Sequence, residues 1–310
     1  MNNISAASDP GIGNQVRLGT TRVRFEHILV CTDFSPGAKA ALDVAISLAK
    51  QFDASLFLVN AAAPLVYPVG ADPVMPELLE ANLDGARARM KRLIARQPAL
   101  RSIKHEGIVS YVSAVELINQ LTREKNINLI VTGSHSAHGL EKLLLGSFAE
   151  TVLRNAICPV LVVGPHCRRT PHPFRSIVFA TGLRPDSQRP AQYASAIAEE
   201  LNARLTLLHV AKKRPPIPGE APELLEERLA DSLRSLLPPD AELWCKPKVL
   251  IAFGDASNEV LNAAAAEAAD LIVVGIHEPT PLADHAPWST MSQIIHGATC
   301  PVLGVREHLG

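Results

Sequence analysis

Short apolar runs alternate along this chain with segments whose apolar residues recur at helical spacing. In the first half, runs rich in Val, Ile and Leu predict strands near residues 27–32, 55–60, 103–110, 128–133 and 159–163. Apolar residues at a spacing of about 3.6 predict helices near 37–51, 76–96, 113–125 and 147–156. Several strands are continuously apolar, which is typical of a parallel sheet covered by helices on both faces.

The same pattern occurs a second time further along the chain. Segment 28–61 aligns without a gap on segment 177–210, and each reads as strand, turn, helix and strand. Two further pairs of segments match in the same way, INLIVTGSH (127–135) with ADLIVVGIH (269–277) and NAICPVLVV (155–163) with GATCPVLGV (297–305). The repeat predicts a Rossmann-like α/β fold of two tandem doubly wound domains, each with a five-stranded parallel sheet.

Length and local composition set the expected domain boundaries. A chain of 310 residues suits two domains of about 150 residues each. The first residues are rich in Ser, Asn, Gly and Thr without an apolar period, and CRRTPHPF has the prolines and charges of a linker. We therefore expect a flexible tail at 1–22, an N-terminal domain at 23–166, a linker at 167–173 and a C-terminal domain at 174–310.

Overall charge and cysteine content exclude several classes of function. With 30 Lys and Arg against 31 Asp and Glu, the chain has no basic excess, so we expect no nucleic-acid partner. No apolar run approaches the roughly 18 residues that span a bilayer, and MNNISAASDPGIGNQ lacks the features of a secretory signal. We expect a cytoplasmic protein without a membrane partner. The five cysteines form no CxxC pair, which argues against a disulfide framework and a zinc site.

The expected ligand site follows from the fold. In doubly wound sheets ligands bind at the carboxyl ends of the strands where the strand order reverses, which selects the loops after strands one and four. Gly133 ends the fourth strand and Gly146-Ser147 opens the last helix, whose free amides suit a phosphate. Asp33 could accept from a ribose hydroxyl or an adenine amino group, or could serve as a turn residue. Glycines at strand and helix ends also have a purely structural interpretation.

A family resemblance sharpens this hypothesis. ILVCTDFSPGAKAAL, followed by LIVTGSHSAHGLEKLLLGSFAETVLRNAICPVLVV, resembles the universal stress protein family of the UspA type, and the two halves resemble a tandem pair. The family's nucleotide-binding members show glycine, two residues, glycine, nine residues, then glycine and Ser or Thr. Here Gly133 is the first glycine and Gly146-Ser147 the closing pair, whereas Ser136 replaces the middle glycine. The implied fold is adenine nucleotide alpha hydrolase-like.

The resemblance implies that the N-terminal domain alone binds ATP, with or without Mg²⁺. The contact residues that it implies are Thr32, Asp33, Thr132, Gly133, Ser136, Gly146, Ser147 and Phe148. Base and ribose would lie near Asp33 and Thr132-Gly133, and the phosphates over Gly133, Ser136, Gly146, Ser147 and Phe148. The Ser136 side chain either narrows the triphosphate site or contributes its hydroxyl to it.

The second half departs from the family's pattern. Gly275 is kept, but Glu278 stands at the middle glycine, Trp288 at the closing glycine and Gly182 at the position of Asp33. A carboxylate repels phosphate, and an indole would occupy the volume that phosphate needs. We therefore expect a degenerate C-terminal domain with a structural role.

The resemblance implies a stress-response sensor or regulator that binds an adenine nucleotide, with at most slow ATP hydrolysis and no catalytic residue. It also implies that the two fifth strands, PVLVV and PVLGV, pair to give an intramolecular pseudo-dimer, which could form a further homodimer. The protein partner is unknown. Two alternatives stay open: a nucleotide-independent stress scaffold or partner-binding protein, and an ATP-dependent enzyme.

Sequence motifs disfavour the enzyme alternative. His135 and His138 in HSAHG partly match the HxGH signature of class I nucleotidylyltransferases, but that signature follows the first strand. Ser147 has no GxSxG context, and the SGGxDS-type pyrophosphate loop of ATP-using synthetases is absent. The basic segment at 85–97 predicts a solvated helix face, with a surface for an acidic partner as the alternative.

Overall fold

The computed structural model describes residues 23–61, 76–134, 145–168, 174–185, 187–212, 222–239, 241, 246–276 and 286–306. The predicted tail at 1–22 and residues 169–173 of the predicted linker lie outside these ranges. Cys245, Glu278 and the predicted contact residue Ser136 lie outside them as well.

Each half of the chain alternates strands and helices. The strands of the first half are β1 (His27–Cys31), β2 (Ser55–Ala61), β3 (His105–Ser110), β4 (Leu129–Gly133) and β5 (Val160–Val163). Its helices are α1 (Pro36–Phe52), α2 (Pro76–Ala95), the 3₁₀ turn η1 (Pro98–Ser102), α3 (Ala114–Glu124) and α4 (Ser147–Asn155). Every strand and helix predicted for this half is present, and η1 is an addition that apolar periodicity does not reveal in so short a segment.

The second half repeats this order. Its strands are β6 (Ser176–Thr181), β7 (Arg204–Ala211), β8 (Lys248–Phe253), β9 (Leu271–Ile276) and β10 (Val302–Arg306). Its helices are α5 (Gln188–Leu201), α6 (Pro222–Arg234), α8 (Ala256–Ala266) and α9 (Ala286–Gly297). The predicted repeat is therefore present in three dimensions.

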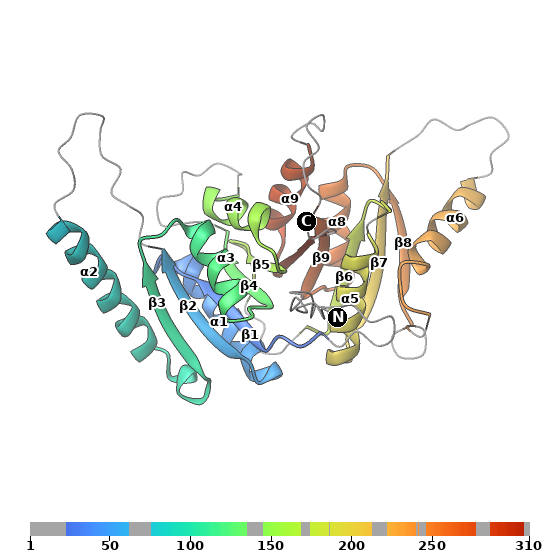
Figure 1. Ribbon diagram of the computed structural model, residues 1–310. Helices are drawn as coiled ribbons and strands as arrows, with labels where there is room; N and C mark the ends of the chain where they lie inside the picture. The colour runs from blue at the N-terminus through green and yellow to red at the C-terminus, as the bar shows by residue number, and fades with distance from the viewer. Residues whose placement is uncertain are drawn as a thin grey trace, which may run out of the picture.

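The two five-stranded sheets join into one ten-stranded sheet (Figure 1). The strand order is β3-β2-β1-β4-β5-β10-β9-β6-β7-β8, and neighbours within each half are parallel. At the centre β5 pairs with β10 in the antiparallel sense, with Leu161 opposite Leu303. The expected pairing of the two fifth strands is confirmed, and it makes the chain an intramolecular pseudo-dimer.

Helices cover both faces of the sheet. Side chains of α1, α2, α5 and α6 share one buried cluster with Ile28 and Val30 of β1. Side chains of α3, α4, α8 and α9 share the other with Leu29 and Cys31. Adjacent residues of one strand thus enter opposite cores, which explains why the strands are apolar throughout.

The basic segment of α2 is solvated. Met90 is buried against the sheet, whereas Arg87 is exposed and pairs with Glu80 and Asp84 of its own helix. Among the described residues, no helix combines the length and apolar character needed to cross a membrane.

Candidate functional site

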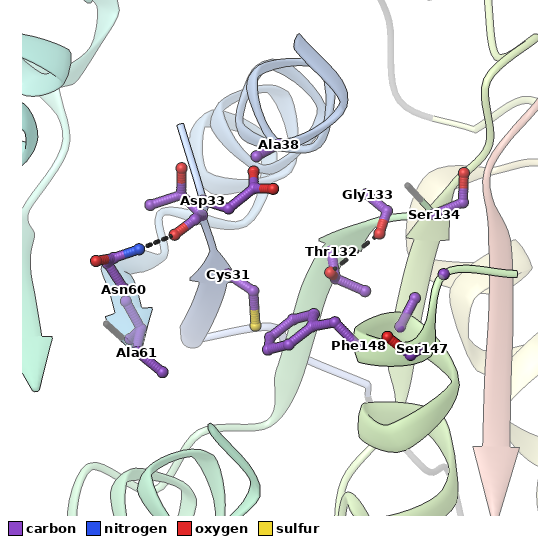
Figure 2. Close-up of a pocket in the computed structure, with 14 residues that line it drawn as sticks. Cys31, Asp33, Ala38, Asn60, Ala61, Thr132, Gly133, Ser134, Ser147 and Phe148 are labelled. Atoms are coloured by element: carbon purple, nitrogen blue, oxygen red, sulfur yellow. Dashed lines mark hydrogen bonds between the residues drawn. The ribbon is translucent and has the colours of Figure 1, made fainter. Parts of the chain in front are cut away.

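A pocket of about 180 Å³ lies at the carboxyl ends of β1, β2 and β4, where the strand order reverses (Figure 2). The strands and the segments after them contribute Cys31, Thr32, Asp33, Val59, Asn60, Ala61, Thr132, Gly133 and Ser134. The first turns of α1 and α4 contribute Ala38, Gly146, Ser147, Phe148 and Ala149. All the predicted contact residues that the structure describes therefore line one cavity.

The turn after β1 places Asp33 at the pocket. Thr32 Oγ1 accepts a hydrogen bond from the Phe34 amide at 3.0 Å, and Asp33 Oδ1 accepts one from the Ser35 amide at 2.9 Å. Phe34 has a left-handed backbone, with φ of 66°, which reverses the chain toward α1. Asp33 is thus a turn residue, as one interpretation of the sequence proposed, and its exposed side chain also borders the pocket.

Asn60 is a pocket residue that the sequence did not single out. Its Nδ2 donates to the Thr32 carbonyl at 2.7 Å, and the side chain is buried (Figure 2). This bond connects the end of β2 to the turn that carries Asp33. The available signal was a polar residue at the carboxyl end of an otherwise apolar strand, SLFLVNA, beside the first strand.

Gly133 has a packing role that its position alone did not reveal. A Cβ at Gly133 would lie 2.8 Å from the backbone C and O atoms of Gly37 in α1. The space that a side chain would need is thus filled by the first turn of α1. The sequence interpretation assigned this space to an approaching ligand, whereas the structure assigns it to helix packing.

The start of α4 presents free backbone donors to the pocket. Gly146 is the N-cap and has no side-chain cap, so Ser147 is the first helical residue and not the N-cap expected from its type. The Gly146 amide donates to the Ser134 carbonyl at 2.8 Å. Within the described part of the chain, the amides of Ser147, Phe148 and Ala149 have no hydrogen-bond acceptor. This end of a helix attracts anions.

The pocket is electrostatically simple. Glu150, in the first turn of α4, pairs with Arg154 at 2.6 Å, which offsets its repulsion of an anion. Burial raises the pKa of the Cys31 thiol, so this thiol is neutral. Among the lining residues of the described pocket, Asp33 is the one carboxylate and there is no histidine.

The second half repeats the turn but not its carboxylate. Thr181 Oγ1 accepts from the Leu183 amide at 3.1 Å, and Leu183 has φ of 53°, as at Thr32 and Phe34. His209 Nδ1 lies 2.9 Å from the Thr181 carbonyl, in the place of Asn60. Gly182 then stands where Asp33 stands in the first half.

The predicted obstruction of the second site stays a prediction. Glu278 is outside the described residues, and Trp288 lies in α9 with a side chain that the structure does not describe. His135 and His138, on which the enzyme alternative depends, are outside the described residues as well.

Comparison with known proteins identifies the fold and the repeat. The model of the universal stress protein family matches residues 24–164 and again 173–306. A universal stress protein of Methanocaldococcus jannaschii is 34% identical over 143 residues, which cover 45% of this chain and 82% of that protein. Universal stress protein A homolog 1 of Coxiella burnetii is 32% identical over 148 residues, which cover 46% and 97%.

Solved structures agree over nearly the whole chain. A universal stress protein from Archaeoglobus fulgidus superposes with a TM-score of 0.67 at 19% identity, covering 91% of this chain and 97% of that one. A structure from Pseudomonas aeruginosa, described as a putative universal stress protein, gives 0.57 at 17% identity, with 91% and 93% covered. At these identities the likeness concerns the fold. The chain belongs to the universal stress protein family and carries two of its domains in tandem.

Proposed function

We propose that the first domain binds one adenine nucleotide, ATP with or without Mg²⁺, and that the chain acts as a nucleotide-dependent sensor or regulator in the stress response. The observation that carries this proposal is the convergence of Asp33, Thr132 and the free end of α4 on one pocket. A carboxylate on one side, and on the other amides that have no acceptor in the described part of the chain, match the two ends of a nucleotide.

The described pocket is smaller than a site that encloses a whole nucleotide. Its volume of about 180 Å³ is below the roughly 300 to 1,000 Å³ of sites that bury drug-sized ligands. The lining residues Ala61 and Ser134 directly precede residues 62–75 and 135–144, which lie outside the described residues. The described walls therefore account for part of a nucleotide.

Calorimetric titration with ATP tests the proposal. We expect saturable binding by the unmodified protein, a large loss on Asp33→Ala, and no binding by Gly146→Trp, whose indole would cover the amides at the start of α4. Asp84→Ala is the matched control, because Asp84 is an exposed carboxylate of α2 outside the pocket. Unchanged affinity in Gly146→Trp would place the ligand elsewhere.

The nucleotide-independent scaffold is a second candidate with one observation in its favour. Packing against Gly37 is a sufficient reason for Gly133, so this part of the glycine pattern does not require a ligand. The absence of calorimetric heat when the unmodified protein is titrated with millimolar ATP would favour the scaffold. Capture of protein partners would then be the informative experiment.

A further inference from the structure

One hydrogen bond connects the second domain to the pocket of the first. The amide of Leu145, the residue before Gly146, donates to Ser292 Oγ of α9 at 2.8 Å. The Leu145 and Ser292 residues are only 7% and 8% exposed, so the amide has little access to water as an alternative acceptor. Leu145 also shares a buried cluster with Met291, next to Ser292.

Two consecutive backbone amides fix the segment that leads into α4, because each donates a hydrogen bond to a different domain. The Leu145 amide donates to Ser292 in the second domain, and the Gly146 amide donates to the Ser134 carbonyl in the first. The next three amides, of Ser147, Phe148 and Ala149, are those that face the pocket without an acceptor among the described residues. The direction in which these three amides point therefore depends on two acceptors, Ser292 in the second domain and Ser134 in the first.

This bond has no counterpart in the second half of the chain. The repeat aligns Leu145 with Pro287, and proline has no amide hydrogen to donate. It aligns Ser292 with Glu150, whose carboxylate pairs with Arg154 of the same helix. The second domain thus accepts a hydrogen bond from the residue before α4, but the first domain cannot accept the equivalent bond from the residue before Trp288 in α9.

The surroundings of α9 restrict its movement relative to the first domain. A Cβ at Gly164, just after β5, would collide with the Ile295 carbonyl of α9, so helix and strand end are in close contact. Nearby, the Arg168 amide donates to the Thr299 carbonyl at 2.8 Å. With β5 and β10 paired beneath, α4 and α9 flank the junction of the two domains (Figure 1).

We propose that Ser292 is a positioning residue for the anion-binding side of the first-domain pocket, and that pocket occupancy is thereby coupled to α9 of the second domain. This inference rests on the proposed function for its ligand, a nucleoside triphosphate. It gives the degenerate second domain a task that a merely structural copy would not have, because a change at α9 alters the ligand site. By reciprocity, a ligand at α4 stabilises the contact with α9.

Three variants of the full chain test the proposal. Ser292→Ala removes the acceptor of a buried amide and should weaken ATP binding roughly tenfold, with faster hydrogen exchange at Leu145 and Gly146. Ser292→Thr keeps the hydroxyl and should restore both properties. Ser257→Ala is the control, because Ser257 is also buried and, among the described residues, its hydroxyl bonds Gln293 of α9 and Asp255 and not the first domain.

The two readouts separate this proposal from the proposed function. If the unmodified protein binds ATP and Ser292→Ala binds it equally well, the positioning role is wrong. The role is also wrong if Ser257→Ala weakens binding as much as Ser292→Ala. If the unmodified protein binds no ATP, the proposed function fails. In that case, hydrogen exchange at the Leu145 and Gly146 amides tests the positioning role by itself. Faster exchange in Ser292→Ala alone supports the role, and unchanged exchange overturns it.

Discussion

Gly133, at the scale of one residue, both lines the pocket and packs against the backbone of α1. Gly133→Ala would place a Cβ against the Gly37 backbone, which cannot rotate away as a side chain would. We expect a loss of about 1 to 3 kcal/mol in the free energy of unfolding, measured by urea denaturation, together with weaker ATP binding because α1 or β4 must shift.

The matched control for this prediction is Gly85→Ala in α2. A Cβ there meets nothing within 4 Å, and replacing glycine by alanine inside a helix is favourable by up to about 1 kcal/mol. Gly85→Ala should therefore leave stability unchanged or raise it. Equal effects of the two substitutions would show that the contact with Gly37 is unimportant.

The described thiols provide a second prediction at this scale. Burial raises the pKa of Cys158 and Cys300 to about 12 and that of Cys167 to about 11. These thiols should stay protonated at pH 8 and react slowly with a thiol reagent until the protein unfolds. Two or more thiols reacting rapidly in the native state would contradict this, because Cys245 is the one cysteine outside the described residues.

The same pKa shifts determine whether the free energy of unfolding rises or falls with pH. A thiol whose pKa is higher in the folded state stabilises that state fully below its unfolded pKa of about 8.5. This contribution is lost as the pH rises through the folded values, because the unfolded chain releases these protons first. Unfolding free energies should therefore decline from about pH 9 upward, and constant stability up to pH 11 would contradict the assignment.

At the scale of elements, the starts of α4 and α9 differ in sequence, with Gly146 at one and Trp288 at the corresponding position of the other. Trp288→Gly alone should not create a second ATP site, because Glu278 still repels phosphate and Gly182 still supplies no carboxylate. Calorimetry with ATP on the double variant Trp288→Gly, Gly146→Trp isolates the second domain. Strong binding by that protein would refute our explanation of why the second half is degenerate.

The order of elements was accessible from the sequence because apolar residues have to alternate with the period of each element. Gly133 and Gly146 also indicated which strand and helix ends border the pocket. Asn60 was missed because its role depends on the neighbouring β1 turn, and Gly37 because its contact with Gly133 depends on how α1 packs. Ser292 lies 147 positions from Leu145 and in the other domain, so the local sequence pattern cannot predict their hydrogen bond.

At the scale of the molecule, pairing of β5 with β10 covers the strand edge that each domain would otherwise expose. A first half produced alone, as residues 23–166, should therefore associate through β5, most simply as a dimer. Sedimentation velocity over a range of concentrations checks this. A folded first half that stays monomeric throughout would show that its β5 edge needs no partner.

The most direct test of the central claim is the molar ratio of nucleotide to chain. Freshly purified protein is denatured, the released ligand is identified by mass spectrometry, and the ratio is checked by calorimetry at saturating ATP. Our account predicts a ratio of roughly one, with the single nucleotide bound at the start of α4 in the first domain. A ratio near two would contradict the degeneracy of the second domain, and a ratio near zero without heat at millimolar ATP would contradict nucleotide binding itself.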